Sequence, residues 1–337
     1  MNNEIVPVEL DYRDLVETYG SPLLVLDQAA VRKQYRALVK ALPGVRMHYA
    51  LKPLPHSAVV ATLKAEGCCF DLATNGEVDL MLENQINPDD CIHTHPIKRD
   101  GDIRYALEYG CKVFVFDNPI ELEKFIPYQD KAQLLLRVSF PNPESKVDLS
   151  KKFGCTPEAT LPLLRKAKEL GLNVIGLSFH VGSQVPNSRR HVEAITACNQ
   201  LIRDAAAENI NLQVLDIGGG FPVNYGADGA DLDIYEFCAP IREALSNTPE
   251  GIRLLAEPGR FISAPCMTSV SSVMGKAERF GRMWYYLDDG LYGSYSGQLF
   301  DHINYPKSAP YATGESLPAV LAGPTCDSID VLADDID

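Results

Sequence analysis

Residues 212–220 read LQVLDIGGG, a short apolar run that leads into a carboxylate and three glycines. From Leu42 onward the chain repeats units of this type: a short run rich in apolar and β-branched residues, a polar junction and a helical stretch. Strands that alternate with helices are typical of a parallel sheet. Eight such runs predict a closed α/β barrel, (β/α)8, of the TIM type. They are RMHYAL (46–51), CCFDLAT (68–74), CIHTHP (91–96), VFVFD (113–117), LLLRVSF (134–140), VIGLSFHV (174–181), LQVLDIGGG (212–220) and IRLLAEPGR (252–260).

The helical stretches carry start signals. In TPEATLPLLRKAKELG, residues 156–171, Thr156 and Glu158 stand where a helix would begin. The strand–helix rhythm stops after Arg260, and the rest of the chain favours short strands separated by turn residues. We therefore expect two domains and an amino-terminal strand that joins the smaller one. The barrel is expected over residues 26–264, the smaller all-β domain over 1–25 and 265–337, and the joining strand at PVEL (7–10) or PLLVLD (22–27).

The composition excludes several classes of protein. The chain has 337 residues, 46% hydrophobic and 23% charged, as in ordinary globular proteins. Its net charge of −14, without a Lys/Arg-rich run, argues against nucleic acid as a partner. No apolar stretch is long enough to span a membrane, and no secretory signal begins the chain. The nine cysteines form no CxxC pair, so we expect a reduced cytoplasmic protein without a zinc ribbon.

Groups that carry charge or bind anions follow the ends of most of the runs. A barrel enzyme builds its active site at the carboxyl ends of its strands. One polar strand end is ordinary, because strand ends are solvated. A lysine, three glycines and an arginine at one edge together suggest an amine nucleophile beside a bound phosphate. The strand-end residues are Lys52, Asp71, His95, Asp117, Arg137, His180, Gly218–Gly220, Glu257 and Arg260.

The glycine run could by itself be only a tight turn after a strand. It matches neither the dinucleotide fingerprint nor the P-loop. Three glycines do let backbone N–H groups approach an anion closely, and loops after the seventh and eighth barrel strands commonly hold phosphate. A phosphate site and a strand-end lysine, Lys52, suit pyridoxal 5'-phosphate (PLP), which a lysine binds as a Schiff base. A carboxylate, Glu257, would keep the pyridine nitrogen of PLP protonated.

Nine ordered blocks between about residues 40 and 330 resemble one family, the barrel-type (alanine-racemase-like, fold type III) PLP-dependent decarboxylases. They resemble most its ornithine/lysine decarboxylase branch. The resemblance implies decarboxylation of a basic L-amino acid, ornithine and/or lysine, to the diamine putrescine or cadaverine. The blocks are HYALK (48–52), FDLATNGE (70–77), KFG (152–154), FHVGSQ (179–184), LDIGGGFP (215–222), AEPGR (256–260), DDGLYGSY (288–295), LFDH (299–302) and GPTCDSID (323–330).

The same resemblance assigns residues around the cofactor. Lys52 would hold PLP, His180 would stack on its ring, and Glu257 would bind the pyridine nitrogen. The phosphate would be bound by Ser183, Gly219, Gly220, Gly259 and Arg260. Supporting the lysine would be Asp71, Glu77 and Arg137.

A second group follows from the homodimer that the resemblance implies, with active sites at the subunit interface. Cys326 of the partner subunit would donate a proton to the α-carbon after CO2 leaves. The distal ammonium of the substrate would be held by Asp301 and the partner subunit's Asp327, with Tyr292 nearby.

Two features depart from the family pattern. Pro53 and the residues after it replace the small residue and asparagine expected behind the lysine. The chain ends at Asp337, where relatives continue with further strands and a Gly-Ala-Tyr block, so we expect the smaller domain to be incomplete.

Three alternatives stay open beside the ornithine/lysine decarboxylase. A diaminopimelate decarboxylase would show Glu-Ser-Gly after the cysteine, where this chain has Asp-Ser-Ile. A racemase on this fold would place an arginine, not Glu257, at the pyridine nitrogen. A catalytically inactive homologue would bind a partner protein. The pair His93 and His95 could ligate a metal, but without a third ligand we expect pocket lining or a structural role and no metal site.

Overall fold

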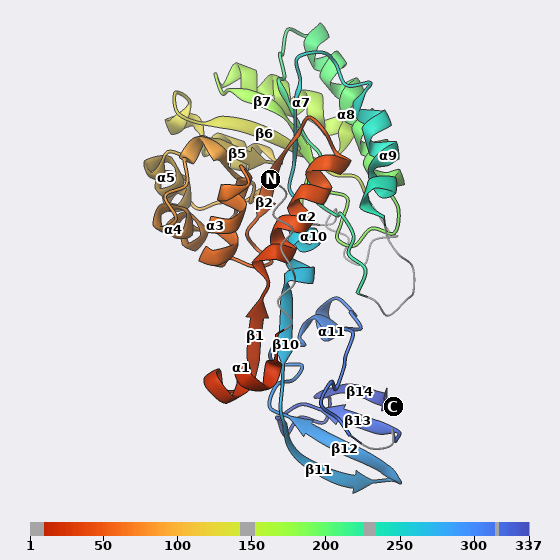
Figure 1. The fold of residues 1–337 in the computed structure, drawn as a ribbon. Coiled ribbons are helices and arrows are strands. Elements are labelled where there is room, and N and C mark those ends of the chain that lie inside the picture. Colours follow the sequence, from red (N-terminus) through yellow and green to blue (C-terminus); the bar gives the residue numbers. More distant parts are fainter. Residues whose placement is uncertain (1–9, 142–151, 226–232, 314–316, 337) are drawn as a thin grey trace, which may run out of the picture. The chain divides into compact units, whose positions relative to one another are not determined.

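The computed structural model describes the chain in four segments and divides it into two compact units (Figure 1). The larger unit consists of Gln28–Val223 and Leu232–Pro265. The smaller unit consists of Met1–Asp27, Asn224–Asp231 and Cys266–Asp337. The described residues are 10–141, 152–225, 233–313 and 317–336.

The larger unit is a closed barrel of eight parallel strands, which confirms the predicted fold. The order around the barrel follows the chain, and β2 closes it by pairing with β9. One register shift interrupts the ladder, at Leu134/Leu135 between β6 and β7. The strands are β2 (Val45–Ala50), β3 (Cys69–Leu72), β4 (Cys91–His93), β5 (Val113–Phe116), β6 (Gln133–Val138), β7 (Val174–Phe179), β8 (Val214–Asp216) and β9 (Arg253–Ala256).

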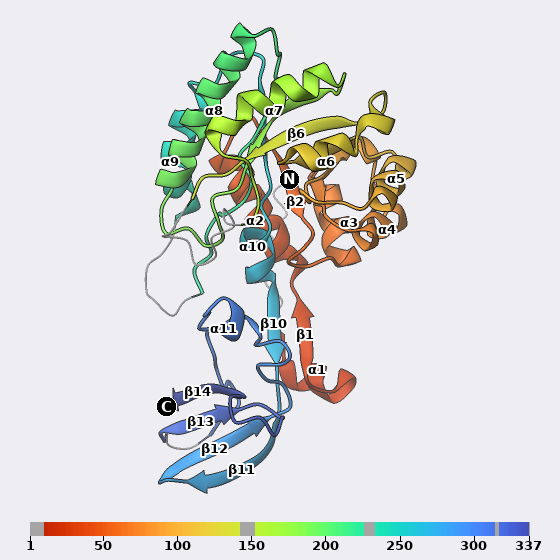
Figure 2. The same ribbon diagram turned by 180° about the vertical axis from the view of Figure 1, so that it is seen from behind.

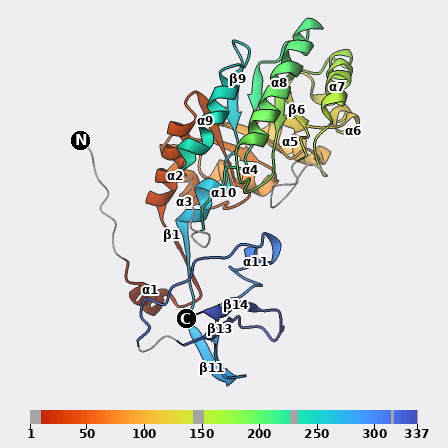
Figure 3. The ribbon, with the colours of Figure 1, turned by 90° about the vertical axis from the view of Figure 1, so that its right-hand side faces the viewer.

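Helices lie on the outside of the barrel, as Figures 2 and 3 show. Their starts follow from local sequence. Thr156 caps α7, accepting a hydrogen bond from the N–H of Ala159, and Pro157 occupies the first turn, as predicted. The helices are α2 (Gln28–Ala41), α3 (Ser57–Ala65), α4 (Asn75–Glu83), η1 (Pro88–Asp90), α5 (Asp100–Tyr109), α6 (Pro119–Glu123), η2 (Ile126–Tyr128), α7 (Pro157–Glu169), α8 (Arg189–Ala207), α9 (Ile234–Leu245) and α10 (Arg260–Ser263).

A buried apolar layer crosses the barrel, and it places the polar groups at the strand ends. The layer contains Val115, Leu135, Ile175, Val214 and Leu255. Side chains two positions apart on a strand point to the same face. The residues two positions after four members of the layer therefore stand on the same face, at the carboxyl ends of the strands. They are Asp117, Arg137, Asp216 and Glu257.

The smaller unit consists of two sheets and short helices. In one sheet β1 (Leu23–Leu26) pairs antiparallel with β10 (Met267–Val270), so PLLVLD forms the predicted joining strand. The other candidate, PVEL, lies outside the described residues except for Leu10. Leu287, Leu291 and Leu332 form a small core. The second sheet has the order β11 (Val273–Arg279), β12 (Arg282–Leu287), β13 (Ala319–Ala322), β14 (Val331–Ile336), and the helices are α1 (Tyr12–Tyr19) and α11 (Gly297–Phe300). The short helix η3 (Ala264–Cys266) contains the point where the chain passes from the larger unit to the smaller one.

Among the described residues, the helices are all too short or too polar to cross a membrane.

Candidate active site

Lys52 follows β2 at the carboxyl end of the barrel, and its side chain is exposed. Its positive charge acts on Asp71, Glu77 and His180, which places these three groups around the amine. They come from the ends of two other strands and from the start of α4. The structure thus brings together groups that lie more than a hundred residues apart in sequence.

The loop after Lys52 packs against the AEPGR block. The N–H of Ala50 donates to the carbonyl of Pro258 at 3.1 Å. A Cβ on Gly259 would lie 2.8 Å from Cγ of Pro53, so the glycine makes room for the proline ring. The proline that departs from the family pattern therefore fits closely against a residue of the predicted phosphate site.

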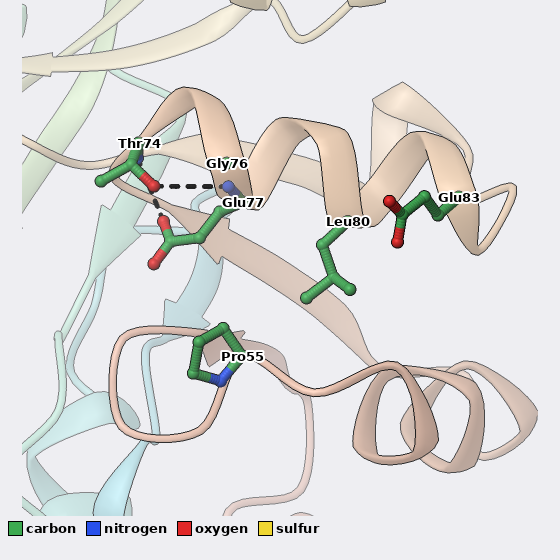
Figure 4. A pocket seen from close by; sticks show the side chains of 6 residues that line it. All are labelled: Pro55, Thr74, Gly76, Glu77, Leu80 and Glu83. Carbon is green, nitrogen blue, oxygen red and sulfur yellow. Dashed lines mark hydrogen bonds between the residues drawn. The ribbon is translucent and has the colours of Figure 1, made fainter.

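Glu77 is held by a capping box at the start of α4. Its carboxylate accepts hydrogen bonds from the N–H groups of Ala73 at 2.5 Å and Thr74 at 3.1 Å, and Thr74 caps the N–H of Glu77 in return. Burial raises the pKa of Glu77, and these N–H groups oppose the shift. Figure 4 shows the Glu77 carboxylate turning back to Thr74, while Leu80 reaches from α4 toward the side on which Pro55 lies; Gly76 and Glu83 complete the lining of this pocket.

Asp71 is a buried carboxyl at the end of β3. Thr94 donates a hydrogen bond to its Oδ1 at 2.5 Å. Burial raises the pKa of Asp71 to about 8, with Asp216 and Glu77 adding to the shift and Lys52 opposing it. At neutral pH this carboxyl therefore retains a proton for much of the time.

Glu257 and Asp216 form a carboxyl pair beside Arg137. Asp216 is fully buried, and its Oδ1 accepts from the N–H of Gly218 at 2.9 Å. Burial raises the pKa of Asp216 to about 6, and the neighbouring Glu257 and Arg137 oppose this shift. Burial, reinforced by Asp216 and Asp71, raises the pKa of Glu257 well above its usual value, while Arg137 lowers it.

His180 presents a neutral ring at the end of β7. Burial, together with the charges of Arg137 and Lys52, lowers the pKa of His180 well below its usual value. Its Nδ1 accepts from the N–H of Gly182 at 3.1 Å, which orients the imidazole. A Cβ on Gly219 would lie 3.1 Å from Nε2 of His180 and 2.7 Å from the carbonyl oxygen of Glu257, so this position requires glycine.

The glycine run forms a cradle for an anion. Gly218 and Gly220 have φ of +65° and +97°, which side chains rarely adopt. In the described part of the chain, the N–H groups of Gly219 and Gly220 have no acceptor. Nε2 of His191 approaches the carbonyl oxygen of Gly219 at 2.9 Å and supports the cradle from behind. Ser183 and Arg260 follow the neighbouring strands, half-buried.

These groups fit PLP. An amine, a neutral aromatic ring, a carboxyl and a set of backbone N–H groups at one barrel end match the aldehyde, ring, pyridine nitrogen and phosphate of the cofactor.

The remaining predicted residues lie in the smaller unit. Cys326 is exposed, whereas the other eight cysteines are buried. The hydroxyl of Tyr292 donates to Oδ2 of Asp327 at 2.5 Å, so these two predicted substrate contacts meet. Asp301 is the carboxyl-terminal cap of α11.

The two histidines make separate aromatic contacts. His93 is 1% exposed and packs against Phe114, while His95 contacts Phe153. Within the described ranges no group of three or more Asp, Glu, His or Cys side chains could hold a metal ion.

Three supporting residues received no role from the sequence. Asp216 pairs with Glu257, His191 holds Gly219, and Asp117 accepts a hydrogen bond from the N–H of Gly154 in the KFG block at 2.7 Å. Asp117 was among the predicted strand-end groups without a role, and the spacing of two residues from the apolar layer would have identified Asp216 in the same way. His191, in α8, has no such signal.

Comparisons with known proteins agree with this site. Residues 28–264 match the family model of the pyridoxal-dependent decarboxylases, pyridoxal binding domain. The lysine/ornithine decarboxylase of Selenomonas ruminantium is 33% identical over 96% of this chain and 82% of its own. The solved lysine/ornithine decarboxylase of Vibrio vulnificus, complexed with putrescine, is 56% identical with a TM-score of 0.91, covering 96% of this chain and 86% of that one.

Another solved structure contains the cofactor. The structure of SrLDC in complex with PLP and cadaverine is 32% identical with a TM-score of 0.90, and it covers 100% of this chain and 85% of that chain. The predicted barrel, the predicted cofactor and the predicted family are thus confirmed, and the chain belongs to the pyridoxal-dependent decarboxylases, enzymes that remove CO2 from amino acids.

Proposed function

We propose that this protein decarboxylates ornithine, lysine or both to putrescine or cadaverine. The observation that carries the proposal is the convergence of Lys52, His180, Glu257 and the glycine cradle at one end of the barrel. The lysine/ornithine decarboxylase relatives support the substrate class.

Each barrel residue has a role that its surroundings suit. PLP, when bound, provides an electron sink for the charge left on the α-carbon as CO2 departs. Lys52 holds the cofactor covalently, and the neutral His180 stacks on its ring. Glu257 shares a proton with the pyridine nitrogen, and Asp216 supports that carboxyl from below. Ser183, Gly219, Gly220, Gly259 and Arg260 hold the phosphate, while Asp71, Glu77 and Arg137 orient the groups around Lys52.

The exposed groups of the smaller unit complete the site in a homodimer. Sγ of Cys326 of the partner subunit donates a proton to the α-carbon of the substrate after CO2 leaves. Its exposure supports this role, because a buried thiol could not reach a substrate.

Substrate choice rests on the distal ammonium. Asp301 and the partner subunit's Asp327 bind it, and the partner subunit's Tyr292 fixes that second carboxylate. Charge-assisted hydrogen bonds contribute about 1.5–3 kcal/mol each, so an amino acid without the distal amine is excluded. Ornithine and lysine differ by one methylene, which distinguishes them by only about 1–3 kcal/mol. Both are therefore expected substrates.

The alternatives are disfavoured by particular residues. Glu257 at the ring nitrogen opposes a racemase, and Asp-Ser-Ile after Cys326 opposes a diaminopimelate decarboxylase. The assembled charged groups around Lys52 oppose an inactive binding protein.

Borohydride reduction with PLP, followed by peptide mass mapping, tests the proposal. We expect visible absorption from the lysine-bound cofactor, a reduced adduct on Lys52 only, and CO2 release from both ornithine and lysine. Lys52→Ala should lose the adduct while remaining folded. A folded chain that forms no adduct at Lys52 would overturn the proposal, and an adduct without CO2 release would favour the inactive homologue.

A further inference from the structure

Asp330 is a buried carboxylate at the end of the GPTCDSID block. It is 2% exposed, although the residues just before it are exposed. Oδ1 accepts a hydrogen bond from the N–H of Leu291 at 2.8 Å. Oδ2 accepts from the N–H of Thr325 at 3.1 Å and from its hydroxyl at 2.7 Å. One side chain therefore binds two segments that are far apart in sequence.

The two segments are the Tyr292 loop, residues 288–296, and the Cys326 loop, residues 323–330. Backbone bonds close the second loop around Asp330, since its carbonyl accepts from the N–H of Gly323 at 2.8 Å and its N–H donates to Asp327 at 3.1 Å. A Cβ on Gly290, in the first loop, would overlap the Asp330 carboxylate, and so would a Cβ on Gly323. Both loops therefore pack directly on this carboxylate.

The two loops are joined by one exposed hydrogen bond and by several buried ones. The Tyr292 hydroxyl bonds to Asp327 at 2.5 Å, but both side chains are exposed, and an exposed hydrogen bond competes with water. The buried bonds to Asp330 do not face that competition. They are thus better suited to hold the loops together than the exposed bond is.

We propose that Asp330 is a positioning residue that joins the Tyr292 loop and the Cys326 loop into one rigid unit. It sets the place of Cys326 and Asp327 relative to Tyr292 without itself contacting substrate. The catalytic consequence rests on the proposed function, whereas the joining of the loops does not.

Hydrogen–deuterium exchange of the full chain tests the joining directly. Asp330→Asn keeps the shape but replaces one acceptor oxygen by an N–H2 group that faces donors. We expect the Tyr292 loop and the Cys326 loop to exchange about tenfold faster together, because buried donors lose their partner. Peptides from the barrel strands should keep their protection. Asp334→Asn, at an exposed position of β14, the strand that begins directly after Asp330, is the matched control and should change neither loop.

A second variant examines whether the bonds act as a unit. Thr325→Val removes the hydroxyl that donates to Asp330 and accepts from the N–H of Asp327 at 3.3 Å, and it should raise exchange in both loops by a smaller factor. Combined with Asp330→Asn it should add little, because the acceptor is already lost. If Asp330→Asn loosens only the Cys326 loop, or loosens the barrel equally, the proposal is wrong.

Steady-state kinetics test the catalytic part of the proposal, which depends on the proposed function. In Asp330→Asn we expect kcat with ornithine or lysine to fall about tenfold, while the cofactor adduct on Lys52 forms as before. Coupled loosening of the loops with unchanged kcat would overturn the catalytic part of the proposal. A parent chain without any decarboxylation would contradict the proposed function instead, and the exchange result would still stand.

Discussion

The chemical groups of the barrel and those of the smaller unit differ in their access to water. In the barrel, Asp71 and Asp216 are 9% and 0% exposed, and burial shifts their pKa values upward. In the smaller unit Cys326 and Asp327 are exposed, and the hydrogen bond from Tyr292 lowers the pKa of Asp327. The pKa values of the barrel carboxyls are thus shifted by burial within the barrel itself.

This difference in burial indicates what preorganises the charged groups in each unit. A group in a water-excluded site interacts strongly with neighbouring charges, whereas an exposed group is screened. In the barrel, an apolar layer excludes water beneath the charged residues. The exposed groups lie on two loops that the buried carboxylate of Asp330 joins.

The comparison is most sharply tested at Glu257. Glu257→Gln should reduce decarboxylation about 10³-fold, because an amide cannot keep the pyridine nitrogen protonated. The fold should remain intact, since a buried carboxyl is replaced by a neutral group of the same shape. CO2 release and thermal unfolding would measure both effects. Glu243→Gln, on the exposed face of α9, is the control, and equal activity of the two variants would remove Glu257 from the site.

A second test concerns a buried ion pair beside the barrel mouth. Nζ of Lys98 lies 3.1 Å from Oε1 of Glu121, with both side chains 1% exposed. Glu121→Gln should lower the free energy of unfolding by about 3 kcal/mol, because the lysine charge stays buried without its partner. Glu208→Gln, which breaks the exposed pair with Arg165, should change stability little. Denaturant unfolding that gives equal effects would contradict the contrast between buried and exposed charges.

The third test moves to the smaller unit. Cys326→Ser should lower kcat about 10²-fold, because a hydroxyl is a weaker acid than a thiol. The melting temperature should not change, since the side chain is exposed. Steady-state kinetics and calorimetry measure the two quantities. Unchanged kcat would exclude Cys326 as the proton donor.

The last test is the pH dependence of stability in the cofactor-free protein. Burial raises the pKa of Asp71 to about 8, above its unfolded value of about 3.8, so the folded state binds the extra proton. Its contribution is complete below the unfolded pKa and is lost as pH rises through the folded pKa. Relative to Asp71→Asn, the parent should lose at most about 1.4 kcal/mol per pH unit between pH 5 and 8. Unfolding curves with parallel pH profiles for the two proteins would show that Asp71 does not titrate there.

Much of the fold followed from the pattern of apolar runs and helix start signals in the sequence, and each exception has a physical cause. The eight strand runs and the Thr156 cap predicted elements that the structure contains. Helix α1 was not anticipated, although Asp11 caps it, because the residues around it carry no long apolar period. Likewise, the parallel pairing of β12 with β13 depends on a connection of more than thirty residues, which strand signals cannot foresee.

In the candidate site, the residues at the strand ends predicted the groups that follow the barrel strands, such as Lys52 and Glu257. The carboxylates that support other site residues, Asp216 and Asp330, were not predicted. In the sequence, Asp216 is only part of a glycine-rich block, and Asp330 is only the end of a cysteine block. Neither role can be predicted from a motif, because each carboxylate contacts residues that are distant in sequence and come close only when the chain folds.

The sequence by itself determined the repeating period, the groups at the strand ends and the family blocks, because these depend on residues close together in the chain. Only the tertiary structure decided the protonation of Asp71, Asp216 and Glu257 and the joining of two loops by Asp330. Burial and electrostatic coupling arise from residues that the fold brings together from distant parts of the sequence.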